Sequence, residues 1–481
     1  MSGAGRHTLG RWIRDRARAT PERTAIDYED RLVTYSELDA GSDAFAARFH
    51  DAGLRRGDRV ATLTGNTPEH VQVFFACAKA GLILVPLSWR LTAPELQYQL
   101  ADAEPALFLV EDDFRELAQQ TSWPFERPVP GTAAPNQAPD VDVSDEDGLL
   151  LIYTSGTTGK PKGALLTHAN CFWTNLSLDL VTPMAEDDVV LQVLPQFHCG
   201  GWNVQPLLAW WKGARVVLER GFDAGRVLEL IERKRVTTLM GVPAIYLFLA
   251  QHPRFAEADL SSLRRAVVGG APMPESLLET WAARGITVVQ GYGLTEAAPN
   301  VLCLPPEEAA RKLGFAGKPY PFVDVSLSDE GELLVAGPNV FPGYWRNADA
   351  TAAAFTPDGL LRTGDVAERD PEGFYRIRGR LKEMYISGGE NVYPAEVEAV
   401  LHEHPDVSDA AVVGVPDERW GEVGAAYVVA DRVSADELLA WCEARLARFK
   451  VPKSIDLVAE IPRNGMGKVQ KQELGQRELA R

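Results

Sequence analysis

The stretch Tyr-Thr-Ser-Gly-Thr-Thr-Gly-Lys-Pro-Lys-Gly occupies residues 153–163 and directly follows the apolar run at residues 149–152. Three glycines, four serines or threonines and two lysines within eleven residues suit the wrapping of an oligophosphate. Glycine lets backbone N–H groups approach the oxygens, the hydroxyls donate hydrogen bonds and lysine supplies charge. The stretch is not a Walker A loop, because Pro161 follows Lys160 where that motif has Ser or Thr. We therefore predict a phosphate-binding loop at the end of a buried strand.

Short apolar runs alternate with helical patterns on both sides of this loop. The helical pattern spans residues 68–80, and strands are predicted at residues 59–63, 82–86 and 107–110. The alternation resumes from residue 148 to about residue 320, with strands predicted at residues 240–243, 265–270 and 286–290. A close succession of strand, helix and strand indicates βαβ units and a buried, largely parallel sheet. Residues 121–147, rich in proline, alanine and acidic residues, are expected to form a connecting loop.

The last third of the chain has a different pattern. Residues 323–380 are rich in glycine and proline, and their alternating pieces at 323–327 and 331–336 predict antiparallel strands or a small barrel. From residue 381 we expect a compact α+β module with helices at 394–402 and 435–448 and strands at 410–415 and 425–430. The predicted fold class is α/β. A large N-terminal domain (residues 1–380) has parallel-rich sheets flanked by helices and a small barrel-like subdomain, and a small C-terminal domain spans residues 381–481.

Composition excludes several classes of function. The chain has 481 residues, of which 46% are hydrophobic, and 49 Lys+Arg against 67 Asp+Glu give a formal net charge of −18. Such a charge repels polyphosphate backbones and anionic lipids, so a nucleic-acid or anionic-membrane binder is not expected. The longest apolar runs are far shorter than the roughly 20 residues needed to span a bilayer. We predict no membrane span.

The cysteines and the N-terminus bear on the compartment. Five cysteines are odd in number, scattered and never spaced as C-x-x-C, which argues against a disulfide framework and a zinc site. The arginine-rich start is interrupted by Asp15, and no apolar targeting region follows it, so a surface helix is the better interpretation. A reducing cytoplasm fits best.

Seven further motifs follow the first one in order: residues 194–198, 267–272, 290–296, 362–365, 379–383, 387–391 and 462–468. Together with residues 153–163 they resemble the signatures of the adenylate-forming (AMP-binding) superfamily, which includes acyl-CoA synthetases, peptide-synthetase adenylation domains and beetle luciferases. The resemblance covers nearly the whole chain and is of the acyl-CoA synthetase, or fatty-acid–CoA ligase, type. Each motif alone is weak, but seven in order are very specific.

The resemblance implies an ATP site and a magnesium site. Glu296 is expected to reach Mg²⁺, directly or through water, Thr295 to donate to the α-phosphate, and Asp365 to accept from the ribose hydroxyls, assisted by Arg380. Tyr292 either stacks on the adenine or is an ordinary packed core tyrosine. The residues expected to contact ATP are Thr154, Ser155, Gly156, Thr157, Thr158, Gly159, Lys160, Lys162, Gly270, Ala271, Pro272, Gln290, Gly291, Tyr292, Gly293, Asp365 and Arg380.

The same resemblance implies two half-reactions and a mobile C-terminal domain. ATP and a carboxylic acid give an acyl-adenylate and pyrophosphate, and the thiol of coenzyme A then displaces AMP. Lys468 is expected to bridge the carboxylate and the α-phosphate, and the hinge lies at Lys382. Gly388, Gly389 and Glu390 are expected to meet the pantetheine arm. Glu383 and the pair Gly465-Met466 depart from the residues often found there, and neither removes a charged group that the chemistry needs.

The acid pocket is predicted between His198 and Pro299. His198 is expected to gate the pocket, with a satisfied core histidine as the alternative, and Cys199 is not expected to act as a nucleophile. No Arg or Lys lies within the pocket segments to pair a second carboxylate, which disfavours dicarboxylates. The substrate is therefore predicted to be an apolar monocarboxylic acid, either a medium- or long-chain fatty acid or an arylpropenoate such as ferulate. The expected walls are Phe197, Trp202, Asn203, Val242, Gly269, Gly291, Ala297 and Ala298.

Two other functions stay open at this point. A stand-alone adenylation enzyme would load the acid onto a carrier-protein thiol in place of coenzyme A. A non-catalytic nucleotide-binding relative is disfavoured by the presence of Lys468, Glu296 and Asp365. The sequence does not reveal the oligomeric state, and a homodimer is among the arrangements open to the chain.

Overall fold

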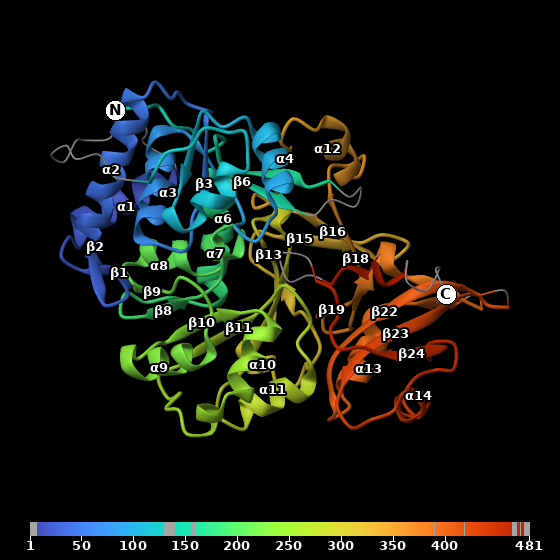
Figure 1. Cartoon of the computed structure of the whole chain (residues 1–481). Coiled ribbons are helices and arrows are strands. Elements are labelled where there is room, and N and C mark those ends of the chain that lie inside the picture. The colour runs from blue at the N-terminus through green and yellow to red at the C-terminus, as the bar shows by residue number, and fades with distance from the viewer. Residues whose placement is uncertain are drawn as a thin grey trace.

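A computed structural model describes residues 7–128, 140–154, 160–388, 390–417, 419–463, 469–471 and 473–475 (Figure 1). Three sheets and their helices come from the first 380 residues, and a fourth sheet comes from the rest. No helix of the described residues is both long and apolar enough to cross a membrane. The predicted loop at residues 121–147 has no helix or strand in its described parts apart from one isolated bridge at Glu126.

The first sheet carries the phosphate-loop motif. Its strands run in the order β17 (Gly343–Tyr344), β7 (Lys162–Thr167), β6 (Gly148–Thr154), β4 (Ile83–Pro86), β3 (Arg59–Leu63) and β5 (Leu107–Val110). Strands β3 to β6 pair in parallel, whereas β6, β7 and β17 pair in antiparallel fashion. The largely parallel character predicted from the sequence holds for this part of the chain, and the antiparallel hairpin β6–β7 places the ends of the 155–161 segment side by side.

The second sheet has nine strands and is also mostly parallel. Its order is β14 (Lys318–Pro319), β13 (Asn300–Cys303), β12 (Val288–Gly293), β11 (Arg265–Val268), β10 (Thr238–Gly241), β8 (Val189–Gln192), β9 (Arg215–Leu218), β1 (Thr24–Tyr28) and β2 (Arg31–Thr34). The strand predicted at 240–243 ends at Gly241, because Pro243 begins the next helix and lacks the N–H that a central strand needs. The third sheet is antiparallel, as predicted for 323–380: β15 (Asp324–Leu327), β16 (Glu332–Ala336), β18 (Leu361–Arg369) and β19 (Tyr375–Arg380).

Helices cover the first two sheets. They are α1 (Leu9–Ala19), α2 (Tyr35–Asp51), α3 (Pro68–Ala80), α4 (Ala93–Ala103), α5 (Arg115–Gln119), α6 (His168–Val181), α7 (Gly200–Asn203), α8 (Pro206–Lys212), α9 (Ala224–Lys234), α10 (Pro243–Gln251), α11 (Glu275–Ala282) and α12 (Ala348–Ala354). Short 3₁₀ turns are η1 (Asp112–Phe114), η2 (Pro253–Ala256), η3 (Thr295–Ala297), η4 (Pro306–Glu308) and η5 (Leu381–Glu383).

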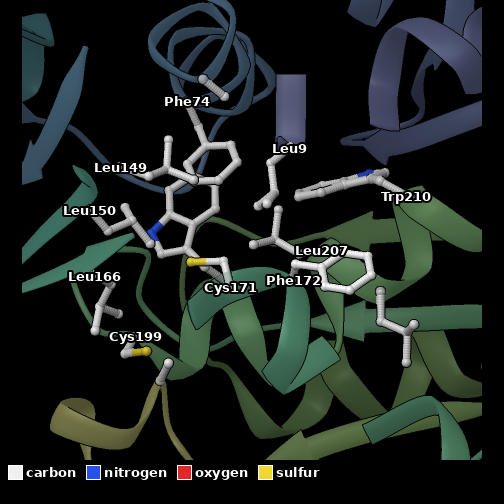
Figure 2. Packing of buried hydrophobic residues seen from close by; sticks show 14 of the residues in the cluster. Leu9, Phe74, Leu149, Leu150, Leu166, Cys171, Phe172, Cys199, Leu207 and Trp210 are labelled. Carbon is white, nitrogen blue, oxygen red and sulfur yellow. The ribbon is translucent and has the colours of Figure 1, made fainter. Parts of the chain in front are cut away.

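Helix α3 has the bounds predicted from the sequence, and its ends explain why. Thr67 accepts a hydrogen bond from the N–H of His70, Pro68 occupies the first turn, and Gly81 ends the helix with a φ of 67°. Its residue Phe74 stacks on Trp202 with ring centroids 4.6 Å apart. Figure 2 shows Phe74 gathered with Leu149 of β6 and Cys171 of α6 in the largest buried cluster. The first sheet and the helices around α3 therefore share one core.

After Arg380 the chain builds a separate sheet beside β18 and β19 (Figure 1). The module contains β20 (Tyr385–Ser387), β21 (Glu390–Val392), β22 (Val407–Asp417), β23 (Gly421–Ala430), β24 (Ser454–Leu457), α13 (Pro394–His402) and α14 (Ala435–Glu443). Helix α14 is shorter than the predicted 435–448, because the chain leaves the helix and turns Leu446 and Phe449 back onto the module's own apolar cluster.

One buried histidine makes stability depend on pH. His168 is fully buried, its Nδ1 accepts the N–H of Leu9, and its Nε2 has no partner among the described residues. Burial lowers the pKa of His168 to about 4. Between pH 6.5 and 4 the His168 imidazole is therefore protonated in the unfolded chain and neutral in the folded chain. The folding free energy contributed by this site is fully present above pH 6.5 and is lost as the pH falls.

We expect His168→Gln to flatten the pH dependence of unfolding. The wild-type free energy of unfolding should fall below pH 6.5 by up to about 1.4 kcal/mol per pH unit for this residue, and the variant should lack that component. Urea unfolding at pH 7.0, 6.0 and 5.0 measures it, with the exposed His50→Gln as the control. Identical slopes in His168→Gln and wild type would contradict this role.

An ammonium between two carboxylates ties the end of the chain to the start of the C-terminal module. The Nζ of Lys471 lies 2.9 Å from Glu383 of η5 and 2.8 Å from Glu398 of α13, and the side chain is 19% exposed. Burial opposes the charged form, and Glu398 and Glu383 outweigh it, so the pKa of Lys471 is raised.

Lys471→Met should loosen this module, because it leaves two partly buried carboxylates facing each other. We expect a loss of about 1–3 kcal/mol, below the cost of breaking a fully buried pair. Hydrogen exchange of α13 and β20 should speed up, while the exposed Lys453→Met should leave it unchanged. Unaltered exchange in Lys471→Met would show that the contacts of Lys471 with Glu383 and Glu398 do not stabilise the module.

Candidate active site

The segment predicted to bind phosphate connects β6 to β7. The two strands are antiparallel with Thr154 opposite Lys162, and Ser155, Gly156, Thr157, Thr158 and Gly159 lie outside the described residues. The ammonium of Lys160 lies 5.8 Å from the ring centre of Tyr98, and that of Lys162 lies 5.2 Å from the ring centre of Tyr344. Neither lysine forms an ion pair within the part of the chain that the structure describes. Both charges are therefore available to an anion.

Glu296 reaches this hairpin from a segment far away in sequence. It lies in η3, and its Oε1 accepts hydrogen bonds from the hydroxyl of Tyr344 (2.8 Å) and from that of Thr154 (3.4 Å). Among the described residues, no group of three or more His, Cys, Asp or Glu side chains could hold a metal by itself. A single carboxylate beside hydroxyls and lysines suits Mg²⁺ that keeps water and phosphate oxygens as its other ligands. Thr295 adjoins Glu296 in the same turn.

A second carboxylate, that of Asp365, is held between an arginine and a tyrosine. Asp365 is 4% exposed, its Oδ1 lies 2.6 Å from Nε of Arg380, and its Oδ2 accepts the hydroxyl of Tyr292 at 2.6 Å. Asp365 and Arg380 are direct neighbours across β18 and β19. Burial and then Asp365 raise the pKa of Tyr292 well above its usual value, so its hydroxyl stays a donor. Neither role expected for Tyr292, stacking or plain core packing, had included this bond.

The loop between β11 and α11 is open to solvent. Gly270 has a φ of 82°, and Gly270, Ala271 and Pro272 are all exposed. Gln290 supports the loop from beneath, because its Oε1 accepts the N–H of Met273 and its Nε2 donates to the carbonyl of Phe315. The exposed backbone of this loop can meet a planar base, whereas the Gln290 side chain is engaged with protein.

The strand that leads to Glu296 depends on glycines. A Cβ on Gly293 would collide with the carbonyl oxygen of Pro299, so only glycine fits there. A Cβ on Gly269 would lie 3.0 Å from Cε of Met240 and 3.4 Å from the carbonyl oxygen of Gly291. A Cβ on Gly270 would lie 3.4 Å from Val242, which is 37% exposed. The ends of β10, β11 and β12 therefore come together around Gly269, and Met240 is a neighbour that the sequence did not single out.

Two of the expected pocket walls lie in the core. Trp202 is fully buried, stacks on Phe74, and donates its indole N–H to the carbonyl of Gln196 at 2.6 Å. Asn203 is also fully buried, and its amide contacts the sulfurs of Cys171 and Cys199. Their polar atoms are taken by protein partners and are not free to bond an acid, so their place among the candidate walls stays a prediction. Ala297 and Ala298 are fully buried as well, next to the Glu296 turn.

His198 lies beside Phe197 and an arginine from another segment. The rings of Phe197 and His198 are 4.7 Å apart, and the guanidinium of Arg90 lies 5.7 Å from the centre of Phe197. Burial, and then the charge of Arg90, lower the pKa of His198 to about 4, so this histidine is neutral at pH 7. The sequence segments of the pocket contain no cation, but the fold brings Arg90 to their edge from the connection between β4 and α4.

The C-terminal module presents the glycine of its first hairpin to solvent. Lys382, Gly388 and Glu390 are exposed, and Gly389 lies outside the described residues. Gly388 has a φ of 62°, and a Cβ there would lie 2.9 Å from the ring of Trp420, itself 39% exposed. Trp420 has no pattern around it in the sequence that would have singled it out. Residues 464–468, which include Lys468, also fall outside the described residues, so their positions are not part of this geometry.

Comparisons with known proteins identify the family and the relatives of this chain. Residues 13–345 match the family described as "AMP-binding enzyme", and residues 396–468 match the "AMP-binding enzyme C-terminal domain". A feruloyl-CoA synthase of Amycolatopsis is 44% identical, with 98% of this chain and 99% of that protein covered. The long-chain-fatty-acid–CoA ligase FadD13 of Mycobacterium tuberculosis is 38% identical, covering 96% and 97%.

A solved structure gives the same result at the level of the fold. The O-succinylbenzoate coenzyme A synthetase of Bacillus subtilis, in complex with ATP and a magnesium ion, matches with a TM-score of 0.88 and 34% identity over 96% of this chain and 98% of that one. Family match, relatives and fold coincide over almost the full length. The chain belongs to the AMP-binding enzyme family.

Proposed function

We propose that this enzyme is an ATP-dependent acid–CoA ligase that activates an apolar monocarboxylic acid as its adenylate and passes the acyl group to coenzyme A. One observation carries the proposal. Thr154, Lys162 and Glu296 gather around one hairpin, and two lysines there have no carboxylate partner among the described residues. A polyphosphate with its metal is the ligand whose charge such a site fits.

The nucleotide would lie across the edges of the first three sheets. The triphosphate would contact the 154–162 hairpin, the base would contact Gly270, Ala271 and Pro272, and the ribose hydroxyls would meet Asp365. Magnesium, held by Glu296 together with phosphate oxygens and water, would neutralise charge on the phosphates. The Arg380 contact orients the Asp365 carboxylate, which suits a group that must accept from a diol.

The two half-reactions need different surroundings at the same place. In the first, the acid carboxylate attacks the α-phosphorus, the bond to pyrophosphate breaks, and Lys468 and Thr295 stabilise the charge that builds on the phosphate oxygens. In the second, a thiolate attacks the acyl carbon and AMP leaves. We propose that the module from residue 381 turns about Lys382 between them, exchanging Lys468 for the Gly388–Gly389 edge.

An aryl acid is the substrate class we favour. A Cβ on Gly269 would lie only 3.0 Å from Met240 and 3.4 Å from the carbonyl oxygen of Gly291, so the space at this glycine is narrow, as a flat ring requires. The feruloyl-CoA synthase is also more similar to this chain than the long-chain-fatty-acid ligase is. An arylpropenoate such as ferulate is therefore the first candidate, and a medium- or long-chain fatty acid is the second. We also propose that the enzyme is cytoplasmic and forms a homodimer.

Pyrophosphate release across a panel of acids tests the proposed function. With ATP and Mg²⁺ we expect ferulate and other arylpropenoates to exceed aliphatic acids by at least about tenfold in kcat/KM, and malonate to give no release above background. Coenzyme A should then accelerate AMP formation, whereas a phosphopantetheinyl carrier protein should not. No ATP consumption with any acid would refute the proposal, and transfer to the carrier protein alone would favour the alternative acceptor.

Lys468→Ala should separate the two half-reactions. We expect a loss of about 10²–10³-fold in acyl-adenylate formation from acid and ATP, because one charge-stabilising donor is removed. Thioester formation from synthetic acyl-adenylate and coenzyme A should be nearly unchanged. Single-turnover assays of each half measure this, with Lys453→Ala as the matched control. Equal losses in both halves would contradict the role assigned to Lys468.

A further inference from the structure

The tyrosine that contacts Glu296 comes from a strand bound to the phosphate hairpin. Tyr344 lies in β17, directly opposite Ala164 of β7. The N–H of the next residue, Trp345, donates to the carbonyl of Gly163 at 2.7 Å. The Tyr344 hydroxyl then donates to Oε1 of Glu296 at 2.8 Å. One residue thus joins the strand that leaves the phosphate loop to the carboxylate on the second sheet.

The residues just before Tyr344 hold the Glu296 turn by its backbone. The N–H of Phe341 donates to the carbonyl of Glu296 at 2.9 Å. The amide of Asn339, which is 1% exposed, donates to the carbonyls of Ala297 (2.9 Å) and Asn300 (3.0 Å). Residues 339–344 therefore fix both the main chain and the side chain of the turn.

The ring of Tyr344 has a second contact on its face. The ammonium of Lys162 lies 5.2 Å from the ring centre, within cation–π range, and Phe341 packs against the same ring at 4.9 Å and 81°. A neutral hydroxyl can orient Glu296 without neutralising it, whereas a lysine or arginine at this place would cancel its charge.

We propose that Tyr344 is a positioning residue for the adenylation reaction. Its hydroxyl fixes Oε1 of Glu296 and leaves Oε2, which accepts no hydrogen bond from any described residue, to face a divalent cation. Its ring holds the Lys162 ammonium beside the phosphate hairpin. The inference rests on the proposed function, in which Glu296 serves the metal.

Tyr344→Phe tests the hydroxyl while it keeps the ring, and with it the contacts to Lys162 and Phe341. Binding of Mn²⁺ in the presence of a non-hydrolysable ATP analogue, followed by electron paramagnetic resonance, measures metal affinity without turnover. We expect affinity about 10- to 100-fold weaker than wild type, the effect of losing one hydrogen bond to a charged group. The Mg²⁺ concentration for half-maximal ATP–pyrophosphate exchange should rise by the same factor, with the rate at saturating Mg²⁺ restored to within about twofold.

Two further variants make the outcome decisive. Tyr35→Phe removes another buried hydroxyl, which donates to the carbonyl of Ala214 at 2.6 Å far from the site, and it should leave metal affinity unchanged. In a Glu296→Gln background, Tyr344→Phe should add no further loss, because the hydroxyl acts through the carboxylate. Unchanged Mn²⁺ affinity in Tyr344→Phe, or a loss that Mg²⁺ does not relieve, would overturn the inference alone. Unchanged affinity in Glu296→Gln would instead overturn the proposed metal role of Glu296.

Discussion

Joining a carboxylate to a triphosphate brings negative charges together. The site must therefore contain cations and hydrogen-bond donors that are not already paired with protein carboxylates. The antiparallel register of β6, β7 and β17 meets this constraint. It sets Thr154 opposite Lys162 and places Tyr344 where its hydroxyl reaches the Glu296 carboxylate and the face of its ring meets the Lys162 ammonium. The carboxylate and the lysine stay close without pairing with each other, and each remains available to metal and phosphate.

The opposite arrangement is found at the other end of the nucleotide site. Asp365 is buried, and its two oxygens are already engaged by Arg380 and Tyr292. Burying a carboxylate without partners is costly, so these two contacts are what allow Asp365 to be buried there. Because Arg380 is the last residue of β19 and η5 follows it, the carboxylate that we propose for the ribose is anchored at the junction to the C-terminal module. The proposed ribose contact and the junction therefore share an ion pair.

Local signals predicted much of this fold. Helix α3 begins and ends where Thr67, Pro68 and Gly81 require it, and the 153–163 motif begins at the end of the buried strand β6, as predicted. Contacts between distant segments were not predictable. Tyr344 and Arg90 have no chemical pattern around them, and they become neighbours of Glu296 and His198 only through strand pairing and chain connections. Trp202 adjoins a motif, yet its partner Phe74 from α3 makes it a core residue.

The overall charge explains why the absence of carboxylate partners for these lysines matters more than the total number of basic residues. A chain of net charge −18 repels both ATP and coenzyme A at long range, so favourable potential has to be local. Most other lysines are bound to carboxylates: Lys79 to Asp39 and Asp43, Lys234 to Asp27 and Asp30. Within the described part of the chain, Lys160 and Lys162 have aromatic faces as partners instead. An aromatic ring orders an ammonium without cancelling its charge, because the attraction comes from the ring quadrupole and leaves the full positive charge to the ligand. The positive charge of the site thus comes from lysines that contact aromatic rings instead of carboxylates, and not from an excess of basic residues.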